Sequence, residues 1–309
     1  MKSLIEKIRF KEKDLTWIAI NHPDEKAIDY LKRNYKFHPL DLEDCLSEIQ
    51  RPKIDDYEDY LFIVLHIPVR VARKNIIQVS ELKIFIGQNF LITLHKDDPN
   101  IKDIFENCKK KKKMKEEYMK KGSGYLLYMI IDDLFESGFP LLDKLSKLMN
   151  ELETEVFDHD YSRDRLKDIL LLKKDIINFR RIIMPQRAII AQLEHKNKKF
   201  LPENLDVYFD DIVDKIEKIW NNLENLQELV ASLQETNESI ISHNTNNVIK
   251  ILTIFSVVML PLTFITGFYG MNVEGLPFVR ETASVPIISG IIIFIALSMI
   301  SYFKYRKWL

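Results

Sequence analysis

Cysteine is scarce in this chain of 309 residues, which contains only Cys45 and Cys108. Two isolated cysteines exclude a disulfide framework and indicate reduced thiols in a cytosolic environment. Glycine is also rare, with 8 residues, and the sequence has no glycine-rich phosphate-binding loop. There is no nucleophile elbow, and the two cysteines and seven histidines have no zinc-ligand spacing. We therefore expect that the protein is not an enzyme.

An excess of one charge is absent as well, because 45 basic residues stand against 46 acidic ones. This balance gives no reason to expect a nucleic acid as partner. The first residues, Met1 to Lys7, lack the apolar stretch of a secretory signal, so none is expected.

Charge is missing altogether from two long runs near the C-terminus, residues 251–273 and 282–303. Each run is as long as the roughly 20 apolar residues that cross a bilayer. We expect a first membrane helix over 248–269, an extracytoplasmic loop over 270–284 and a second membrane helix over 285–303. The remaining residues, 304–309, would form a short basic tail.

The distribution of charge around these spans predicts the topology. Two spans place both termini on the same side of the membrane. Lys250 precedes the first span, and Lys304, Arg306 and Lys307 follow the second. Cations concentrate on the cytoplasmic side of membrane proteins, so we expect both termini in the cytoplasm and the protein in the cell (inner) membrane.

The preceding residues have the pattern of a soluble α+β protein. Within 1–122 we expect a cytosolic α/β domain with a helical extension. Strand-like runs occupy 14–20, 60–67, 76–86 and 90–94, and Gly87-Gln88 is a suitable hairpin turn. Helical spacing covers 24–35, after the cap residue Asp24, and 40–47. The sequence therefore predicts an antiparallel sheet with short helices.

Long helices are expected over 123–247, as a cytosolic bundle and stalk. Helical periodicity runs over 125–157 and again over 162–195. From 205 to 268 no strong helix breaker occurs except Pro261. One continuous helix over this stretch would be about 95 Å long at about 1.5 Å per residue. Such a helix would lead from the soluble part directly into the first membrane span.

One stripe of this long helix has a heptad spacing, in alternating steps of three and four residues. The stripe, hereafter the seam, is mostly small or polar and consists of Ser232, Glu235, Ser239, Ser242, Asn246, Ile249, Thr253, Ser256, Leu260, Thr263, Gly267 and Gly270. Small residues in a membrane favour close helix packing, with hydroxyls bonded to the helix backbone. The alternative is a polar pore lining with Ile249 and Leu260 as apolar constrictions. The polar continuation of the seam outside the membrane favours the pore.

Three further features each have a plain and a functional interpretation. Pro261 is either a tolerated kink or a residue that turns the carbonyl of Val257 toward a wet axis. The lysine run at 109–115 is either a solvated helix face or a basic rim near anionic lipid or the inner pore mouth. The acidic cluster near the start of the long helix is either solvated N-terminal charge or part of a cation site; it contains Asp206, Asp210, Asp211 and Asp214.

The segment Tyr269-Gly-Met-Asn272 follows the first span, which contains Pro261-Leu-Thr263, and a second span ends in a basic aromatic tail. With these features the chain resembles the CorA family of magnesium channels. The resemblance extends over most of the chain and includes His38-Pro-Leu-Asp-Leu-Glu-Asp44, Gln50-Arg-Pro-Lys53, Tyr125-Leu-Leu-Tyr128 and Asn246-Asn-Val-Ile-Lys-Ile-Leu-Thr253. It implies a homopentamer with a funnel-shaped cytosolic part, in which five long helices surround one pore and five second helices lie outside.

The resemblance also implies site residues. Gly270, Met271 and Asn272 would form the selectivity filter, where side-chain carbonyls accept hydrogen bonds from the water shell that Mg²⁺ gives up reluctantly. Asp44 and Asp211 would bind regulatory Mg²⁺ between neighbouring subunits, with Glu43 and Asp132 at a nearby secondary site. The pore lining would consist of Asn246, Ile249, Leu252, Thr253, Ser256, Leu260, Thr263 and Gly267, of which Leu252 comes from the resemblance alone.

The partners implied are other copies of the chain, the lipid bilayer and divalent cations. The expected ion is Mg²⁺, with Co²⁺ or Ni²⁺ as alternative substrates, because zinc-transporting relatives typically have Gly-Ile-Asn in place of Gly-Met-Asn. A zinc, cobalt or nickel transporter of the same superfamily and a membrane-anchored signalling scaffold remain the alternatives. Ile249 and Leu260 stand where relatives frequently have methionine, and Val273 replaces a phenylalanine, which leaves the gating threshold open.

Overall fold

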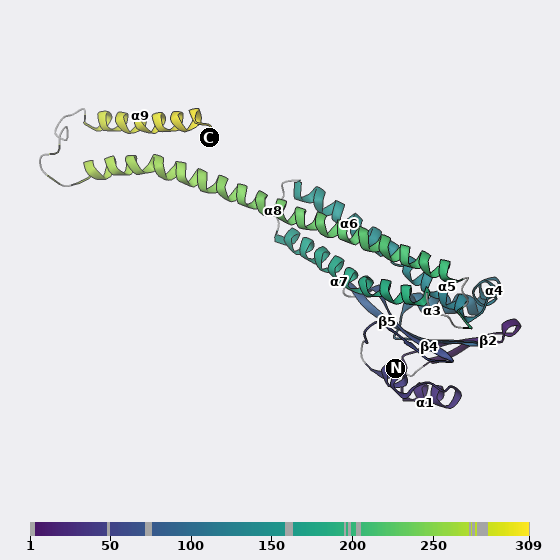
Figure 1. Ribbon diagram of the computed structural model, residues 1–309. Helices are drawn as coiled ribbons and strands as arrows, with labels where there is room; N and C mark the ends of the chain where they lie inside the picture. Colours follow the sequence, from purple (N-terminus) through teal and green to yellow (C-terminus); the bar gives the residue numbers. More distant parts are fainter. Residues whose placement is uncertain are drawn as a thin grey trace. The chain divides into compact units, whose positions relative to one another are not determined.

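The computed structural model describes residues 4–47, 50–71, 76–157, 163–194, 196, 199–201, 205–271, 273, 276 and 284–308. The chain divides into two compact units, Met1–Leu233 and Gln234–Leu309, which are described one at a time. Figure 1 traces the elements of both. The domain boundaries expected from the sequence at 122 and 247 stay predictions.

Unit 1 is built on a six-stranded sheet with the order β1-β2-β6-β5-β4-β3. Its strands are β1 (Leu4–Phe10), β2 (Leu15–Asn21), β3 (Lys53–Asp56), β4 (Tyr60–Val71), β5 (Ile76–Gly87) and β6 (Phe90–His95), with a short 3₁₀ turn η1 (Lys11–Lys13) between the first two. The expected turn at Gly87-Gln88 joins β5 to β6, which pair antiparallel.

The sheet is mixed, which corrects the expectation of an antiparallel sheet. β2 and β6 run parallel, from Thr16 opposite Phe90 to Asn21 opposite His95, whereas the other four pairs are antiparallel. A parallel pair requires a long crossover, and here the whole stretch from α1 to β5 supplies it. Strand periodicity predicts which residues are extended, but it does not determine which strands become neighbours.

The two outer strands, β1 and β3, were not predicted. In β1 the buried Ile8 and Phe10 alternate with exposed Lys7 and Arg9, so a period-two signal is present although the segment is highly charged. In β3, Lys53 to Asp56, no side chain is fully buried, as is typical of a short edge strand. Such a strand leaves almost no hydrophobic signal.

Helices cover both faces of the sheet. One face packs against α1 (Glu25–Asn34) and α2 (Pro39–Leu46) through a cluster that includes Phe62, Phe85 and Leu31. On the other face Trp17, which is fully buried, meets Phe105 of α3 (Pro99–Lys110) at 4.9 Å in an edge-on contact. Figure 1 shows α1 on one side of the strands and α3, α5 (Ser123–Glu136) and α7 (Arg163–Glu194) on the other. Because both faces are covered, the central strands are apolar almost throughout.

The remaining helices are α3 (Pro99–Lys110), α4 (Lys112–Met119), α5 (Ser123–Glu136), α6 (Phe139–Phe157), α7 (Arg163–Glu194), α8 (Asp206–Tyr269) and α9 (Ser284–Tyr305). The single helix expected over 125–157 is therefore wrong, because α5 and α6 are separate. Gly138 donates its amide to Phe135 at 2.9 Å, which closes α5. Pro140 then follows without an amide hydrogen to continue the ladder.

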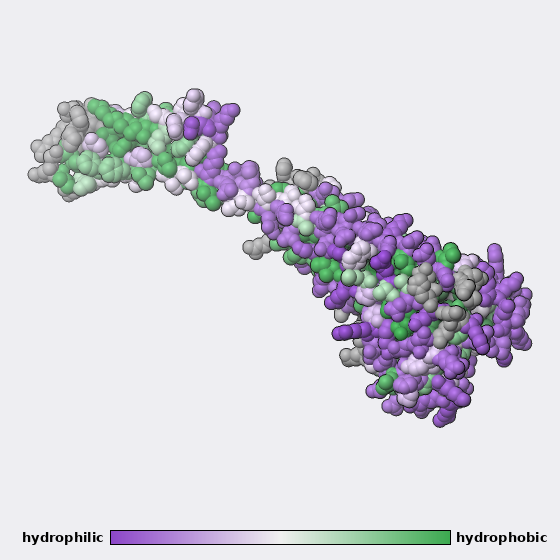
Figure 2. Space-filling view, in the orientation of Figure 1, coloured by the Kyte–Doolittle hydropathy of each residue, from purple (hydrophilic) through white to green (hydrophobic). Residues whose placement is uncertain are grey.

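The long helix expected over 205–268 is confirmed, since α8 has 64 residues and contains Pro261 in its interior. In unit 2 the apolar end of α8 and the span Val285–Tyr305 of α9 each contain an 18-residue stretch, with mean hydropathies of 2.3 and 2.2, and both are long enough to span a bilayer. Most of their apolar side chains, with Ile254 and Phe303 as buried exceptions, lie at the surface of the chain, where Figure 2 shows a hydrophobic zone. An exposed zone of this kind requires lipid or a partner to cover it.

Candidate cation pathway and carboxylate sites

The apolar part of α8 has two different faces. Its less exposed positions include Ile254, Val258 and Ile265. Because successive residues are about 100° apart, Ser256 lies on the side opposite Ile254, and the other seam residues follow it. Every residue of the seam, from Ser232 to Gly270, is exposed in the single chain. The fold thus presents the whole seam as one accessible stripe on a continuous helix.

The hydroxyls of the seam are bonded to the backbone of their own helix. Thr253 donates to the carbonyl of Ile249, Ser256 to that of Leu252 and Thr263 to that of Met259, each at 2.8 Å. The packing interpretation expects these bonds. Each hydroxyl oxygen still has lone pairs that can accept from water. The stripe therefore offers weak acceptors at regular intervals without offering charge.

The apolar members of the predicted pathway are among the most exposed residues of α8. Leu260 is 69% exposed, Leu252 59% and Ile249 53%. Exposing three large aliphatic side chains on a stripe that is otherwise small and polar is unfavourable for a lone helix in water. Around a shared axis, the same side chains would form constrictions that exclude water.

The end of α8 is closed by two backbone bonds. Gly270 donates to the carbonyl of Thr266 at 2.9 Å, and Met271 to that of Phe268 at 3.4 Å. A Cβ at Gly270 would lie 2.9 Å from the Thr266 carbonyl oxygen, so a larger residue would have to displace the backbone here. Asn272, the third residue of the expected filter, lies outside the described residues.

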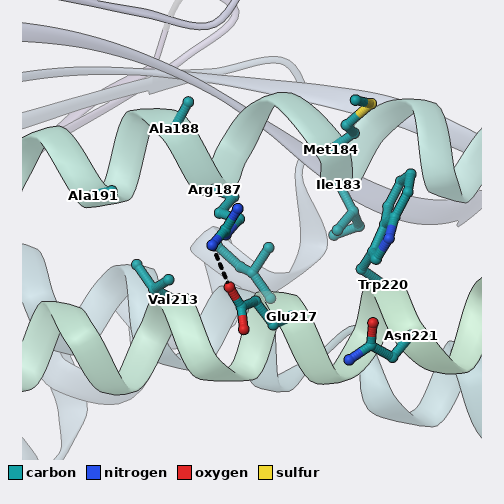
Figure 3. Close-up of a pocket in the computed structure, with 10 residues that line it drawn as sticks. Ile183, Met184, Arg187, Ala188, Ala191, Val213, Glu217, Trp220 and Asn221 are labelled. Atoms are coloured by element: carbon teal, nitrogen blue, oxygen red, sulfur yellow. Dashed lines mark ion pairs between the residues drawn. The ribbon is translucent and has the colours of Figure 1, made fainter.

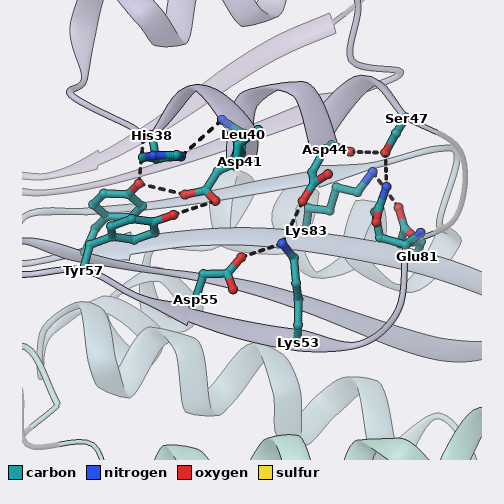
Figure 4. Close-up of polar contacts among 12 residues, drawn as sticks. His38, Leu40, Asp41, Asp44, Ser47, Lys53, Asp55, Tyr57, Glu81 and Lys83 are labelled. Carbon is teal, nitrogen blue, oxygen red and sulfur yellow. Dashed lines mark hydrogen bonds and ion pairs between the residues drawn. The ribbon is translucent and has the colours of Figure 1, made fainter.

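The first pair of expected regulatory carboxylates lies on α2, in unit 1. Asp41, one turn earlier, is buried and anchors the helix by accepting from Tyr57 at 3.0 Å and from Tyr60 at 2.7 Å (Figure 4). Burial raises the pKa of this carboxyl, which the two hydroxyls partly counter. Asp44 is half-buried, and its carboxylate accepts from Lys53 of β3 at 2.7 Å, whereas Glu43 is exposed.

The second pair, Asp132 and Asp211, is brought together by a lysine. Lys215 of α8 donates to Asp132 of α5 at 2.6 Å and lies 3.6 Å from Asp211, one turn before it. The same ammonium lies 3.5 Å from Glu136. Asp132 is largely covered and Asp211 is exposed, with 19% and 58% of their side chains accessible. One end of this cluster thus faces solvent.

Within the described residues, no group of three or more acidic, histidine or cysteine side chains is close enough to hold a metal ion. Both expected donor sets are therefore incomplete. One consists of Asp44 and Glu43 on α2, and the other of Asp132 on α5 and Asp211 on α8. Hard cations such as Mg²⁺ take oxygen ligands and retain several waters, so the residues fit this ion only as halves of a site or through water. This is compatible with ligands contributed by two subunits.

Both lysines were missed in the sequence. Lys215 follows Asp211 by four residues, the spacing of a helical ion pair, and Lys53 ends the segment Gln50-Arg-Pro-Lys53. These signals were present, but helix spacing alone does not place Lys215 against Asp132, which comes from a different helix.

A groove of about 700 Å³ lies between α7 and α8 in unit 1 (Figure 3). Apolar side chains such as Met184 and Trp220 line it, and Arg187 pairs with Glu217 at 2.5 Å across it. None of the expected ligand carboxylates is among the described residues that line the groove. It therefore does not belong to the candidate cation site.

The lysines of 109–113 are exposed and divided between α3 and α4. Lys110 pairs with Glu106 at 2.9 Å, Lys112 with Glu116 at 3.7 Å and Lys109 with Glu6. The pairs of Lys110 and Lys112 are those of a solvated helix face, whereas the pair of Lys109 joins α3 to β1.

Comparison with known proteins places this architecture. The family model described as "CorA-like Mg2+ transporter protein" matches residues 12–307, nearly the whole chain. The chain belongs to the CorA family. This is a family of transporters and not of enzymes, and its match covers both the sheet domain and the two apolar helices.

Relatives and a solved structure agree with the assignment. The "Cobalt/magnesium transport protein CorA" of Thermotoga maritima is 30% identical over 95% of this chain and 83% of its own length. The "Zinc transport protein ZntB" of Yersinia pseudotuberculosis is 20% identical over 95% and 88%. The complete structure of the CorA magnesium transporter from Methanocaldococcus jannaschii matches with a TM-score of 0.86, at 23% identity over 98% of this chain and 94% of that one. The last match establishes the same fold.

Proposed function

We propose that the protein is a magnesium channel that carries divalent cations inward across the cell (inner) membrane, as a homopentamer with both termini in the cytoplasm. The observation that carries the proposal is the exposed seam of α8. Although the end of this helix lies in the apolar zone, a stripe of mostly small and polar residues runs along its surface. Several copies of the chain around one axis would turn this stripe into a pore lining.

The proposed direction of transport follows from the membrane potential. Moving one charge across 100 mV is worth about 2.3 kcal/mol, so a divalent cation gains about 4.6 kcal/mol on entering a negative interior. The membrane potential therefore drives uptake through a passive pore. Such a pore requires a gate that limits the entry of cations.

At the outer mouth, a ring of Asn272 side chains would accept hydrogen bonds from the water shell of the ion. A ring of carboxylates would bind a divalent cation more tightly and release it more slowly. The steric contact of Gly270 with the Thr266 carbonyl supports a filter in which the helix ends sharply before the asparagine.

The proposed gate consists of Ile249, Leu252 and Leu260, whose exposed side chains would narrow and dry the axis. Regulation is assigned to the carboxylates of unit 1. Cytosolic Mg²⁺ between Asp44 and Asp211 of neighbouring subunits, with Glu43 and Asp132 at a secondary site, would hold the subunits together. Loss of the ion would let the carboxylates repel one another and open the pore.

Flux into proteoliposomes tests this proposal, with Mg²⁺, Co²⁺, Ni²⁺ and Zn²⁺ measured in parallel. We expect Mg²⁺ uptake by the wild type and none by Asn272→Ala, which assembles normally because the change removes only an amide in a loop. Asn222→Ala, at an exposed position of α8 in unit 1, is the matched control and should transport like the wild type.

The same panel separates the alternatives. The name of the Thermotoga maritima relative includes cobalt beside magnesium. A cobalt or nickel transporter would carry those ions faster than Mg²⁺. Zinc transport alone would contradict the Gly-Met-Asn argument. A signalling scaffold would pass none of the four ions, and full Mg²⁺ uptake by Asn272→Ala would overturn the filter.

A further inference from the structure

Lysine ammonium groups occupy the carboxylates that are expected to sense Mg²⁺. Lys215 contacts Asp132 and Asp211, and Lys53 contacts Asp44 at 2.7 Å and Asp55 at 2.5 Å. Both donor sets of the proposed intersubunit site thus carry an internal cation. Figure 4 shows Lys53 reaching from its strand to the carboxylates on both sides.

Lys215 is placed by its surroundings and is not an ordinary surface residue. Only 24% of its side chain is accessible, and its closest partner comes from another helix. The hydrogen bond to Asp132 and the nearby carboxylates of Asp211 and Glu136 hold its ammonium in this position.

Lys218, one turn further along α8, provides the contrast. Its ammonium lies 5.5 Å from the ring of Phe139. The two lysines add the same charge to the same helix. Of these two lysines, Lys215 alone pairs with carboxylates assigned to cation binding, among the residues that the structure describes.

We propose that Lys215 is a built-in competitor of Mg²⁺ for Asp132 and Asp211, and that it sets the Mg²⁺ concentration at which the cytosolic unit responds. Lys53 has the same role at Asp44. This inference rests on the proposed regulatory site and specifies what determines its affinity.

The physical reason is ligand charge. The affinity of a carboxylate site for a hard cation increases with the number of uncompensated negative charges. A lysine that shares the carboxylates removes one such charge, occupies some of their acceptor positions and repels a divalent ion at close range. Mg²⁺ must therefore displace the ammonium or bind beside it, which shifts half-occupancy to higher concentrations.

The same lysine also acts when no ion is bound. Carboxylates that are partly neutralised by lysine repel the facing subunit less strongly than bare ones. The difference in repulsion between the ion-bound and ion-free forms is then smaller than carboxylates alone would give. Competition by the lysines for the carboxylates keeps the sensor from saturating at low Mg²⁺.

Binding of Mg²⁺ to the purified full-length protein tests the inference without a transport measurement. The midpoint of Mg²⁺ protection against limited proteolysis is compared for the wild type, Lys215→Gln, Lys215→Arg and Lys218→Gln. We expect a midpoint about tenfold lower for Lys215→Gln, since a repulsive neighbour is removed. Lys215→Arg keeps the charge and should stay within about twofold of the wild type, as should Lys218→Gln.

Lys53→Gln should lower the midpoint in the same direction. An unchanged midpoint for Lys215→Gln would overturn the inference. A shift of the same size for Lys218→Gln would also overturn it, because it would show a general effect of removing one positive charge from α8. Lys215→Met retains the length of the aliphatic stem and replaces the glutamine variant if that one does not assemble.

Asp211→Asn distinguishes this inference from the proposed function. If Asp211→Asn abolishes Mg²⁺ protection while Lys215→Gln behaves like the wild type, the site stands and the competitor is refuted. If Asp211→Asn leaves protection intact, the regulatory site itself lies elsewhere, and the role of Lys215 falls with it.

Discussion

The two units of the chain treat apolar side chains in opposite ways. In unit 1 they are removed from solvent between helices and sheet, so that Phe62 is 0% exposed. In unit 2 they lie outward, so that Phe264 of α8 is 70% exposed. The same residue type therefore packs in a protein core in unit 1, whereas in unit 2 it lies on a surface suited to contact with lipid. The difference indicates that unit 1 is built for an aqueous environment and the apolar helices of unit 2 for a bilayer.

Charge follows the opposite distribution. Unit 1 contains every ion pair described above, including those of Lys53 and Lys215 with the carboxylates of the proposed sensor. The runs 251–273 and 282–303 contain no charged residue at all. Under the proposed function, charge in unit 1 would sense a divalent cation, whereas in unit 2 the ion would meet the hydroxyls and apolar side chains of the seam.

Exchanging a phenylalanine in each unit should expose the contrast most strongly. Phe62→Ala leaves a cavity in a fully packed core and should lower the free energy of unfolding of unit 1 by about 3–5 kcal/mol. Phe264→Ala should leave that free energy unchanged. Denaturant unfolding measures both, followed by the fluorescence of the buried Trp17 in a background in which Trp220 and Trp308 are replaced by Phe. A similar loss in the two variants would contradict the assignment of Phe264 to the lipid-facing surface.

A polar substitution at the proposed gate sharpens the comparison within unit 2. Leu260→Asn should hydrate the constriction and raise basal Mg²⁺ flux at inhibiting cytosolic Mg²⁺ by about tenfold or more. Phe264→Leu, one turn further along α8 and off the seam, should have no such effect. Proteoliposome flux gives the measurement. If Leu260→Asn assembles and conducts no more than the wild type, the gate lies on another face of the helix.

Acidification should lower the free energy of unfolding of unit 1, by less than Phe62→Ala does. His95 is buried, and burial lowers its pKa, although the nearby Asp98 and Asp97 partly oppose this. The unfolded chain therefore binds a proton at a higher pH than the folded one. The stability contributed by neutral His95 is fully present at neutral pH. It declines as the pH falls below about 6.5, the ordinary pKa of histidine.

His95→Gln should flatten this dependence, whereas His243→Gln, at an exposed position of α8, should not. Thermal unfolding of unit 1 between about pH 7 and pH 5 tests the difference. An unchanged pH profile in His95→Gln would assign the acid sensitivity to another group.

The sequence predicted the parts of the molecule that depend on local patterns. The continuity of α8, the two apolar helices, the hairpin turn at Gly87-Gln88 and the cap of α1 by Asp24 are all local, and all are confirmed. The parallel pairing of β2 with β6, the break at Gly138 and the contact of Lys215 with Asp132 depend on tertiary neighbours. No periodicity encodes them.

The role of Asn272 and the pairing of Asp44 with Asp211 remain predictions, because the first residue is outside the described ranges and the second pairing involves two chains. The structure adds to them the exposure of the whole seam and the two lysines. These features turn a resemblance into specific experiments.

The central claim is that unit 1 senses the ion that unit 2 conducts. Its most direct test is Mg²⁺ flux as a function of the Mg²⁺ concentration on the side of residues 1–233, for the wild type and Asp211→Ala. We predict that rising Mg²⁺ on that side suppresses flux in the wild type, and that Asp211→Ala continues to conduct. Equal flux at low and high Mg²⁺ in the wild type would contradict the account.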